Sequence, residues 1–351
     1  MSINTTPINL QSNVANREEV LAQPGLTSAG RPFLIVIVAV LVGVLLIPFV
    51  PDIKFYSLSV IILVFVYGGL ATAWSIAGGY AGSHSVGHAA FVGLGAYTST
   101  ILLRDFNLSP WIGMLFGMVV AGLVAALLGY LTFRSGLRGD YFTLATVAAG
   151  MVIYELANGL PKLTAGSQGL PISYEPNPWM FQFSDRNVYY YVAFAMWLAI
   201  VVIAYRIRKS RMGYEMLAVR DDEAAAARGG ISVMRAKLGS FIISAALCAA
   251  IGTFLAQFYL YIDPMSVMSL AMSVQIILIA ALGGMNSYLG GTLGALILVP
   301  IMQWLATVLQ GYPGVDLAIY GLVLVLVMIF MPFGVLGLLR KSTKWRKVIG
   351  W

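Results

Sequence analysis

Cysteine is nearly absent from this chain, since Cys248 is the only one among 351 residues. It lies inside an apolar run. A single cysteine excludes both a disulfide framework within the chain and a cysteine metal site. Charge is also scarce: Asp, Glu, Lys and Arg make up 10% of the sequence, against about a quarter in soluble domains. Hydrophobic residues reach 60%. These shortages exclude an ordinary soluble domain and predict a membrane protein.

Catalytic and nucleotide-binding signatures are missing as well. The sequence contains no Ser-His-Asp arrangement, no metal-ligating cluster and no acid paired with a base in one segment. No Gly-rich loop ends in Gly-Lys-Ser or Gly-Lys-Thr, the pattern that cradles nucleotide phosphates, so the chain itself is not an ATPase. We therefore expect neither an enzyme nor a bound cofactor.

Long apolar runs dominate what is present. A helix needs about 20 predominantly apolar residues to cross a bilayer, and ten runs approach or exceed this length. The sequence therefore predicts an all-α polytopic membrane protein with about ten transmembrane helices, or eight or nine if some runs re-enter the membrane. The runs cover residues 33–50, 57–76, 85–103, 110–133, 140–158, 188–206, 236–262, 268–283, 287–307 and 316–338.

The distribution of positive charge predicts the orientation. With both termini in the cytoplasm, 17 of the 21 Lys and Arg residues lie inside, as the positive-inside rule requires. The net charge of +7 comes from basic residues beside apolar spans, which fits contact with inner-leaflet lipid rather than nucleic acid. The four basic residues left outside are Lys54, Arg104, Lys162 and Arg186.

Three regions are expected along the chain. Residues 1–31 are polar and lack a basic stretch leading into an apolar core, so we expect a cytoplasmic tail rather than a cleaved signal peptide. Residues 32–340 form the transmembrane domain, and residues 341–351 form a basic cytoplasmic tail.

One cytoplasmic loop, residues 206–237, interrupts the apolar pattern. It carries eight of the 21 Lys and Arg residues. The alanines at 224–227 favour a helix, which the glycines at 229 and 230 should end. Small side chains would let such a helix enter a groove on another protein. The segment is therefore interpreted either as a plug for a cytoplasmic partner or as a solvated linker helix.

Glycine and other small residues mark two further features. Segments 78–88 and 283–291 break the apolar pattern, one in each half of the chain. Backbone groups freed by such breaks need partners from protein or water, so broken helices often line a pathway; tight turns are the alternative.

In the run 236–262, small residues recur every four positions and predict a face for close helix packing. They are Ser240, Ser244, Cys248, Gly252 and Ala256.

Six segments in a fixed order resemble a known family. They are 79–97 (Gly-Tyr-Ala-Gly, then Ser-Val-Gly-His-Ala-Ala-Phe), 137–142 (Leu-Arg-Gly-Asp-Tyr-Phe), 163–170 (Leu-Thr-Ala-Gly-Ser-Gln-Gly-Leu), 220–231, 282–295 and 332–337 (Pro-Phe-Gly-Val-Leu-Gly). Together they resemble the LivM-type permeases, the membrane subunits of ATP-binding-cassette (ABC) importers for branched-chain amino acids and related small solutes. The resemblance covers roughly residues 57–340.

The resemblance implies a subunit of a larger importer. The implied partners are a second, LivH-like permease, two cytoplasmic ATPase subunits and an extracytoplasmic solute-binding protein, all around a membrane-embedded chain. Segment 220–231 looks like the family's ATPase-coupling loop. The segment can be aligned with the family motif in two ways that differ by one residue, so that either Gly229 or Gly230 is the motif glycine. The residues assigned to coupling are Arg220, Glu223, Ala224, Ala225, Ala226, Gly229 and Gly230.

The resemblance also implies a solute pathway along the broken segments. The chain departs from the family there, because Asn286 stands where Gly is common. Met151 occupies a position often held by Glu, and Glu155 lies one helical turn further along. The residues assigned to the pathway are Ser85, Gly87, His88, Glu155, Gly283, Gly284 and Asn286.

Glu155 and the two histidines have alternative interpretations. Glu155 is the one carboxylate well inside an apolar run, so it either meets the ammonium group of a solute or pairs with Lys162. His84 and His88 are four residues apart, which suits one helical face and a metal site. No third ligand lies nearby in the sequence, so we predict a structural or pathway hydrogen bond and no metal.

An ion-coupled secondary transporter is the alternative function. It would also have about ten spans and broken helices, but it would be expected to carry several buried carboxylates, whereas Glu155 stands alone. The solute is open among branched-chain amino acids, urea, amides and small carboxylates, because the partner binding protein largely selects it. Homodimeric and heterodimeric pairing of the permease are open as well.

Overall fold

Long helices account for most of the structure, as the apolar runs predict. The computed structural model describes residues 55–308 and 321–322, which belong to one unit, Pro48–Leu338. Within these residues, seven helical segments are long and apolar enough to cross a membrane. They are α3 (Phe55–Ser75) with the π-helical turn η2 (Ile76–Tyr80), α5 (Pro110–Arg134), α6 (Gly139–Gly159), α8 (Arg186–Lys209), α11 (Val233–Tyr259), α12 (Pro264–Met268) with α13 (Leu270–Gly283), and α14 (Gly290–Val308).

The number of spans stays a prediction. Helix α4 (His88–Phe106) corresponds to the expected run 85–103 and lies among the other helices, packed on α5 and α11. The expected run 33–50 and nearly all of the run 316–338 lie outside the described residues, as do both predicted tails. The seven spanning candidates and α4 therefore account for eight of the ten expected runs.

Short elements connect the long helices at both ends. The prediction of an all-α chain is right for the spans but wrong at one place, where β1 and β2 pair antiparallel with Leu170 opposite Ile262. Strands of two residues are too short to produce an alternating pattern in the sequence. The short elements are α7 (Pro161–Thr164), η3 (Gly166–Gln168), β1 (Leu170–Pro171), η4 (Pro178–Met180), α9 (Arg211–Asp221), α10 (Glu223–Arg228) and β2 (Tyr261–Ile262).

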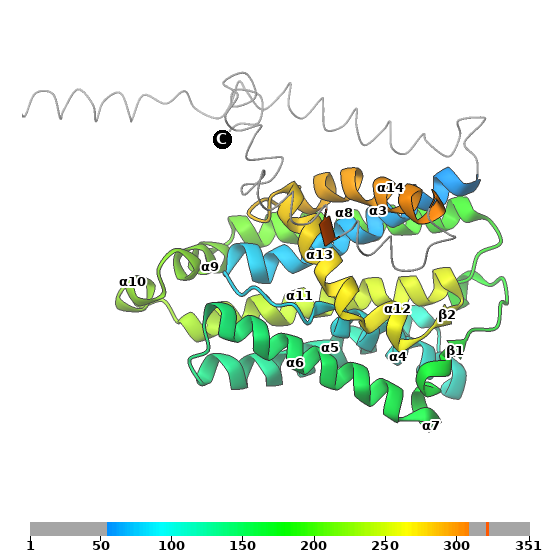
Figure 1. Cartoon of the computed structure of the whole chain (residues 1–351), viewed down its shortest axis with the longest axis horizontal. Helices are drawn as coiled ribbons and strands as arrows, with labels where there is room; N and C mark the ends of the chain where they lie inside the picture. The colour runs from blue at the N-terminus through cyan, green and yellow to red at the C-terminus, as the bar shows by residue number, and fades with distance from the viewer. Residues whose placement is uncertain (1–54, 309–320, 323–351) are drawn as a thin grey trace, which may run out of the picture. The chain divides into compact units, whose positions relative to one another are not determined.

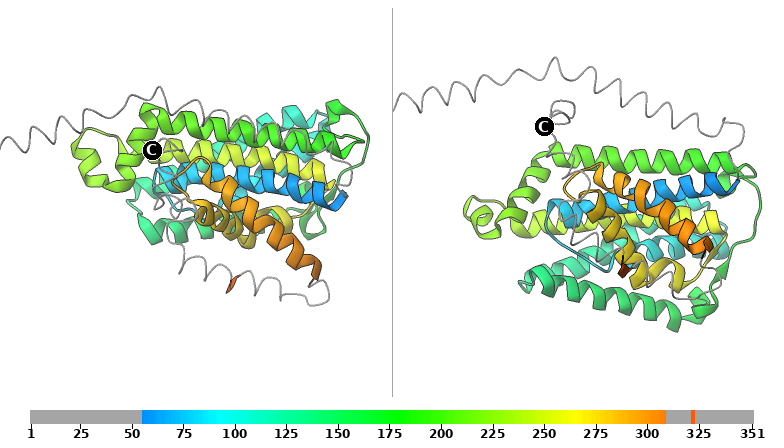
Figure 2. Two further views of the ribbon diagram at one scale, coloured as in Figure 1. Left: turned by 90° about the horizontal axis from the view of Figure 1, so that it is seen from above. Right: turned by 45° about the horizontal axis from the view of Figure 1, so that its top comes forward.

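Helix α11 runs through the middle of the bundle and packs against α3, α4 and α5 (Figures 1 and 2). All five small residues predicted to form its packing face are buried. A Cβ atom on Gly252 would lie 1.9 Å from the carbonyl oxygen of Val92, and one on Gly95 would lie 2.0 Å from that of Ala249. The backbones of α4 and α11 therefore touch, which confirms the predicted seam.

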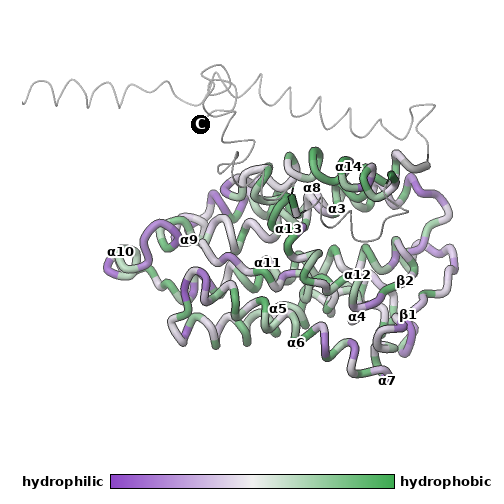
Figure 3. Tube along the Cα trace, in the orientation of Figure 1, coloured by the Kyte–Doolittle hydropathy of each residue, from purple (hydrophilic) through white to green (hydrophobic). Residues whose placement is uncertain are grey.

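Polar residues collect at the two ends of the helices (Figure 3). One end carries α9 and α10, and the other carries α7, β1 and β2. Arg134, Arg138 and the eight basic residues of 206–237 gather at the α9–α10 end, where Arg138 contacts Glu223. Among the described residues, the opposite end has Arg104, Lys162 and Arg186. The basic residues are thus divided unequally between the ends, as the positive-inside argument expects.

Candidate functional site

The segment between α8 and α11 folds into two short helices. After α9, Asp222 takes an extended conformation, and its carboxylate accepts hydrogen bonds from the N–H groups of Ala224 and Ala225 at 2.8 and 2.9 Å. An acidic residue that caps a helix in this way fixes where the helix begins. Helix α10 ends just before the two glycines, and Gly230 adopts a φ of 83°. The predicted Ala-rich helix and its glycine stop are both confirmed.

The two sides of α10 differ in exposure. Ala224, Ala225 and Ala227 are exposed, as are the glycines at 229 and 230 that follow. Ala226 is only 6% exposed, because its side chain faces the protein's own interior. The residues assigned to coupling therefore include one, Ala226, that does not present its side chain at the surface.

Glu223 points back into the chain instead of outward. Its carboxylate forms ion pairs with Arg138, at 3.0 Å, and with the Nζ atom of Lys237 on α11. Lys237 is itself 6% exposed, and its ammonium lies 5.7 Å from the centre of the Phe133 ring. A buried ammonium needs such a partner, because an unpaired charge is costly away from water. Glu223 thereby fastens α10 to α11 and to the α5–α6 connection.

Arg220, at the end of α9, reaches both glycine-rich breaks. Its Nη1 atom donates to the carbonyl oxygen of Gly79 at 3.1 Å and to the side-chain oxygen of Asn286 at 2.9 Å. The Nε and Nη2 atoms donate to the carboxylate of Asp221 at 3.0 and 2.8 Å. The planar guanidinium has five N–H donors, so it can hold all three partners together.

The two breaks lie against each other at this end. A Cβ atom on Gly79 would lie 1.8 Å from the carbonyl oxygen of Met285, so the two backbones are in direct contact. The first break passes from η2 into an irregular stretch, residues 81–87. The second is a compact turn, in which the N–H of Ser287 donates to the carbonyl of Gly284 at 3.1 Å. The turn interpretation therefore describes the geometry of the second break.

Helix α8 also contacts both breaks through aromatic rings. The guanidinium of Arg208 lies 5.7 Å from the ring centre of Tyr80 in the first break. Tyr205 meets Tyr288 of the second break edge-on, with ring centres 5.2 Å apart. Burial raises the pKa of the Tyr288 phenol above its ordinary value. The two breaks, α8 and α9 thus form one connected end of the bundle.

Three residues predicted for the pathway are buried where α4 begins. The carbonyl oxygen of Ser85 accepts a hydrogen bond from the indole of Trp74 at 2.7 Å. The Nε2 atom of His88 lies 2.9 Å from the hydroxyl of Ser244 on α11, a hydrogen bond of the kind expected for this histidine. A Cβ atom on Gly87 would lie 2.2 Å from a backbone oxygen of α6. All three are enclosed by the chain itself, as is Gly283 of the second break.

The helical pairing of the two histidines is not observed. Helix α4 begins at His88, so His84 lies on the irregular stretch and does not share a helical face with it. Among the residues that the structure describes, no three His, Cys, Asp or Glu side chains lie together as a metal-binding group.

Glu155 lies on the outer, exposed side of α6. It belongs to an open groove whose other residues are apolar or glycine: Met151, Val152, Leu156, Gly159 and Leu160. Within the described ranges it makes no ion pair, so the alternative pairing with Lys162 is not observed. A carboxylate is thus placed on a helix face that is otherwise apolar.

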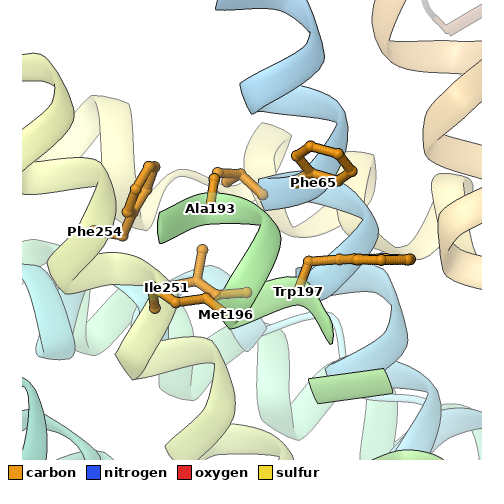
Figure 4. Close-up of a pocket in the computed structure, with 7 residues that line it drawn as sticks. Phe65, Ala193, Met196, Trp197, Ile251 and Phe254 are labelled. Carbon is orange, nitrogen blue, oxygen red and sulfur yellow. The ribbon is translucent and has the colours of Figure 1, made fainter. Parts of the chain in front are cut away.

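A small pocket between α3, α8 and α11 is not a solute site. Phe65, Ala193, Met196, Trp197, Ile251 and Phe254 surround it with apolar atoms (Figure 4). Its volume is about 10 Å³, roughly enough for one water molecule and far less than an amino acid needs.

Sequence reasoning missed two residues of the α9–α10 end, Arg138 and Lys237. Arg138 was visible only as part of the Leu-Arg-Gly-Asp-Tyr-Phe segment, and Lys237 only as one of many loop charges. Their common partner, Glu223, lies 85 and 14 positions away, and neither spacing is the three or four residues at which two side chains on one helix come into contact.

Comparison with known proteins agrees with the resemblance seen in the sequence. The family described as "Branched-chain amino acid transport system / permease component" matches residues 56–331. The chain belongs to this family. It is accordingly a multi-pass permease subunit of a transport system and not an enzyme.

Relatives with curated names include both LivM and LivH permease proteins. The chain is 27% identical to the high-affinity branched-chain amino acid transport system permease protein LivM of Escherichia coli (strain K12), over 88% of this chain and 76% of the relative. It is 28% identical to LivH of the same strain, over 77% of this chain and 91% of the relative. The LivM protein of Salmonella typhimurium is 27% identical over 82% of this chain and 72% of the relative. No solved structure matches the chain significantly.

Proposed function

We propose that this permease imports branched-chain amino acids, or a chemically similar small solute, as one of two membrane subunits of an ABC importer. In this proposal, α10 docks one of two cytoplasmic ATPase subunits, and an extracytoplasmic binding protein delivers the solute. The LivM and LivH relatives, whose names place them in branched-chain amino acid transport, support the solute class. The second permease would be a LivH-like chain.

The observation that carries the proposal is the construction of α10. Its outward side consists of small alanine side chains, Ala224, Ala225 and Ala227, which leave room for close approach of another protein surface. Its inward side is held by the ion pairs of Glu223 and by the buried Ala226. A slim, anchored helix of this kind can receive a push from a partner and pass it to the bundle. A solvated linker would not need these anchors.

The proposed orientation places the α9–α10 end in the cytoplasm, together with both termini. Ten basic residues of the described chain gather at this end and three at the other, which supports the assignment. ATP is available only in the cytoplasm, so ATPase docking and the charge distribution require the same orientation.

Of the pathway residues, Glu155 is the one that we place between this chain and its partner permease. A carboxylate on an otherwise apolar, membrane-spanning surface is costly against lipid, so Glu155 should face protein or a water-filled passage. The exposed side of α6 is therefore the surface that we assign to the second permease and the solute. Ser85, Gly87, His88, Gly283, Gly284 and Asn286 would act behind this surface, by shaping the broken segments.

An Ala225→Arg substitution tests the proposal. Arg is a good helix former, so α10 should remain helical, but its long side chain should obstruct a docked partner. In cells whose own copy is replaced by the variant, uptake of labelled leucine should fall. ATPase activity that co-purifies with the permease should fall with it, about tenfold or more. Ser184→Arg, an exposed position at the opposite end, is the control for docking and should leave ATPase recovery unchanged. Normal uptake and normal ATPase recovery in Ala225→Arg would contradict the docking role.

A further inference from the structure

Three distant parts of the chain meet at one side chain. Arg220 is separated by 141 positions from Gly79 and by 66 from Asn286, yet its Nη1 atom bonds to both. Gly79 belongs to the break between α3 and α4, and Asn286 to the break between α13 and α14. One guanidinium therefore joins the two breaks to α9.

Arg220 is joined to α10 as directly as the backbone allows. Only Asp222 separates α9 from α10, and its side chain caps α10 while its own N–H donates to the carbonyl of Ala218 in α9. A displacement of α10 must therefore move the end of α9 that carries Arg220. The anchoring of Glu223 to Arg138 and Lys237 adds a second connection, to α11 and the α5–α6 turn.

The junction is built tightly around the arginine. Gly82 has a φ of 68°, and a Cβ atom there would lie 3.0 Å from the Cγ atom of Arg220. Asp221 holds the opposite edge of the guanidinium and limits its rotation. The backbone contact between Gly79 and Met285 leaves the two breaks no space to move independently. The bonds from the guanidinium are charge-assisted, and such bonds are shorter and stronger than neutral ones.

We propose that Arg220 is a positioning residue that transmits the movement of α9 and α10 to both glycine-rich breaks at once. Its role is therefore inward: it connects the docking helix to the broken segments, rather than contacting the ATPase. The inference rests on the proposed function, because it assumes that an ATPase moves α10. It adds the path by which that movement reaches the interior of the bundle.

The test measures coupling separately from docking. The complete importer, purified with its ATPase subunits and reconstituted into vesicles, is assayed for ATPase recovery, ATP hydrolysis and leucine transported per ATP. The Arg220→Gln importer should retain its ATPase subunits, and these should still hydrolyse ATP. The amount of leucine transported per ATP should fall about tenfold, because glutamine cannot make the charge-assisted bonds of the guanidinium. Arg220→Lys keeps the charge but not the planar donors, so its leucine transported per ATP should lie between the values of Arg220→Gln and the unmodified importer.

Asn286→Ala removes one acceptor on the exposed side of the junction and should lower the same ratio by a smaller factor. If the bond between the two side chains carries the effect, the double variant should be no worse than Arg220→Gln alone. Arg211→Gln is the matched control, because this arginine lies on the same helix with a side chain that is 94% exposed. Its ratio should equal that of the unmodified importer.

Three results would overturn the inference. They are a normal ratio in Arg220→Gln, loss of the ATPase subunits from that variant, and fully independent effects of Arg220→Gln and Asn286→Ala. If the Arg220→Gln permease itself does not fold and insert into the membrane, Asn286→Ala decides, and a normal ratio of leucine transported per ATP in that variant would overturn the inference as well. Failure of the proposed function is distinguishable, since the unmodified importer would then show no ATP-dependent uptake.

Discussion

Gly252, with Gly95 opposite, sets the close distance between the two central helices α11 and α4. Gly252 lies where any side chain would meet the backbone of α4 at Val92. The sequence shows Gly252 as one of five small residues at four-residue spacing, which predicts a packing face. The spacing does not say which helix packs there, because any helix with a small-residue face could do so.

Gly252→Leu should destabilise the permease by about 3 kcal/mol or more, because the added side chain has to separate two touching backbones. Thermal melting and yield of the detergent-purified protein measure this. Gly159→Leu is the matched control, since a Cβ atom there meets nothing within 4 Å. Leu255, on another side of α11, is unsuitable as a neutral comparison because it is only 3% exposed. Equal melting temperatures for the two glycine variants would contradict the close contact.

Glu223→Gln should be more destabilising than an equivalent change at an exposed ion pair. It leaves the buried Lys237 without its carboxylate partner, which typically costs about 3 kcal/mol. Glu215→Gln breaks the exposed pair with Arg211 and should cost about 1 kcal/mol or less. Comparing the thermal stabilities of the two purified variants tests this. Similar small losses in both would show that Lys237 does not depend on Glu223.

The two sides of helix α10, one exposed and one buried, have different environments. Its composition predicts a helix, and its glycines predict the end, so its existence follows from local preferences. Which alanine faces outward depends instead on the angle at which Asp222 starts the helix and on the anchoring of Glu223. The exposed and buried sides should therefore respond differently to the same substitution.

Ala226→Arg should lower the melting temperature of the permease even when no ATPase is present, since it forces a long charged side chain into a buried position. Ala225→Arg should leave that temperature nearly unchanged, because position 225 is exposed. Melting of the isolated permease, compared between these two variants, is the measurement. A lower melting temperature in Ala225→Arg than in Ala226→Arg would reverse the assignment of the two sides.

The bundle as a whole has a strongly basic end and a weakly basic end. Lys and Arg residues next to a span are held on the cytoplasmic side during insertion, so this asymmetry determines orientation more than any single contact does. The ion pair between Arg138 and Glu223 shows that the α5–α6 connection lies at the same end as α9 and α10.

Cysteine labelling in intact cells tests the orientation. In a Cys248→Ala background, a cysteine at Asn177 should react with an impermeant thiol reagent added outside, because position 177 is exposed at the weakly basic end. A cysteine at Arg211 should react only after the cells are opened. One at Ser342, which lies outside the described residues, should behave like the one at Arg211. Labelling at Arg211 in intact cells would reverse the orientation.

Local chemistry in the sequence determined the class of the protein, its helical spans, the seam on α11 and the Ala-rich helix between α9 and α11. These features depend on residues that are neighbours in the chain or one helical turn apart, so composition and spacing suffice to predict them. The six family segments likewise point to a branched-chain amino acid transport permease, the family to which the chain belongs.

Tertiary structure alone decided which distant residues meet. Arg220 with Gly79 and Asn286, and Glu223 with Arg138, are contacts between separate helices, and no periodicity relates their positions. Tertiary packing also buried Ala226, separated His84 from the helix of His88 and left Glu155 on the open side of α6. Burial and partner choice depend on how helices pack in three dimensions, whereas the sequence specifies directly only the order in which they follow one another.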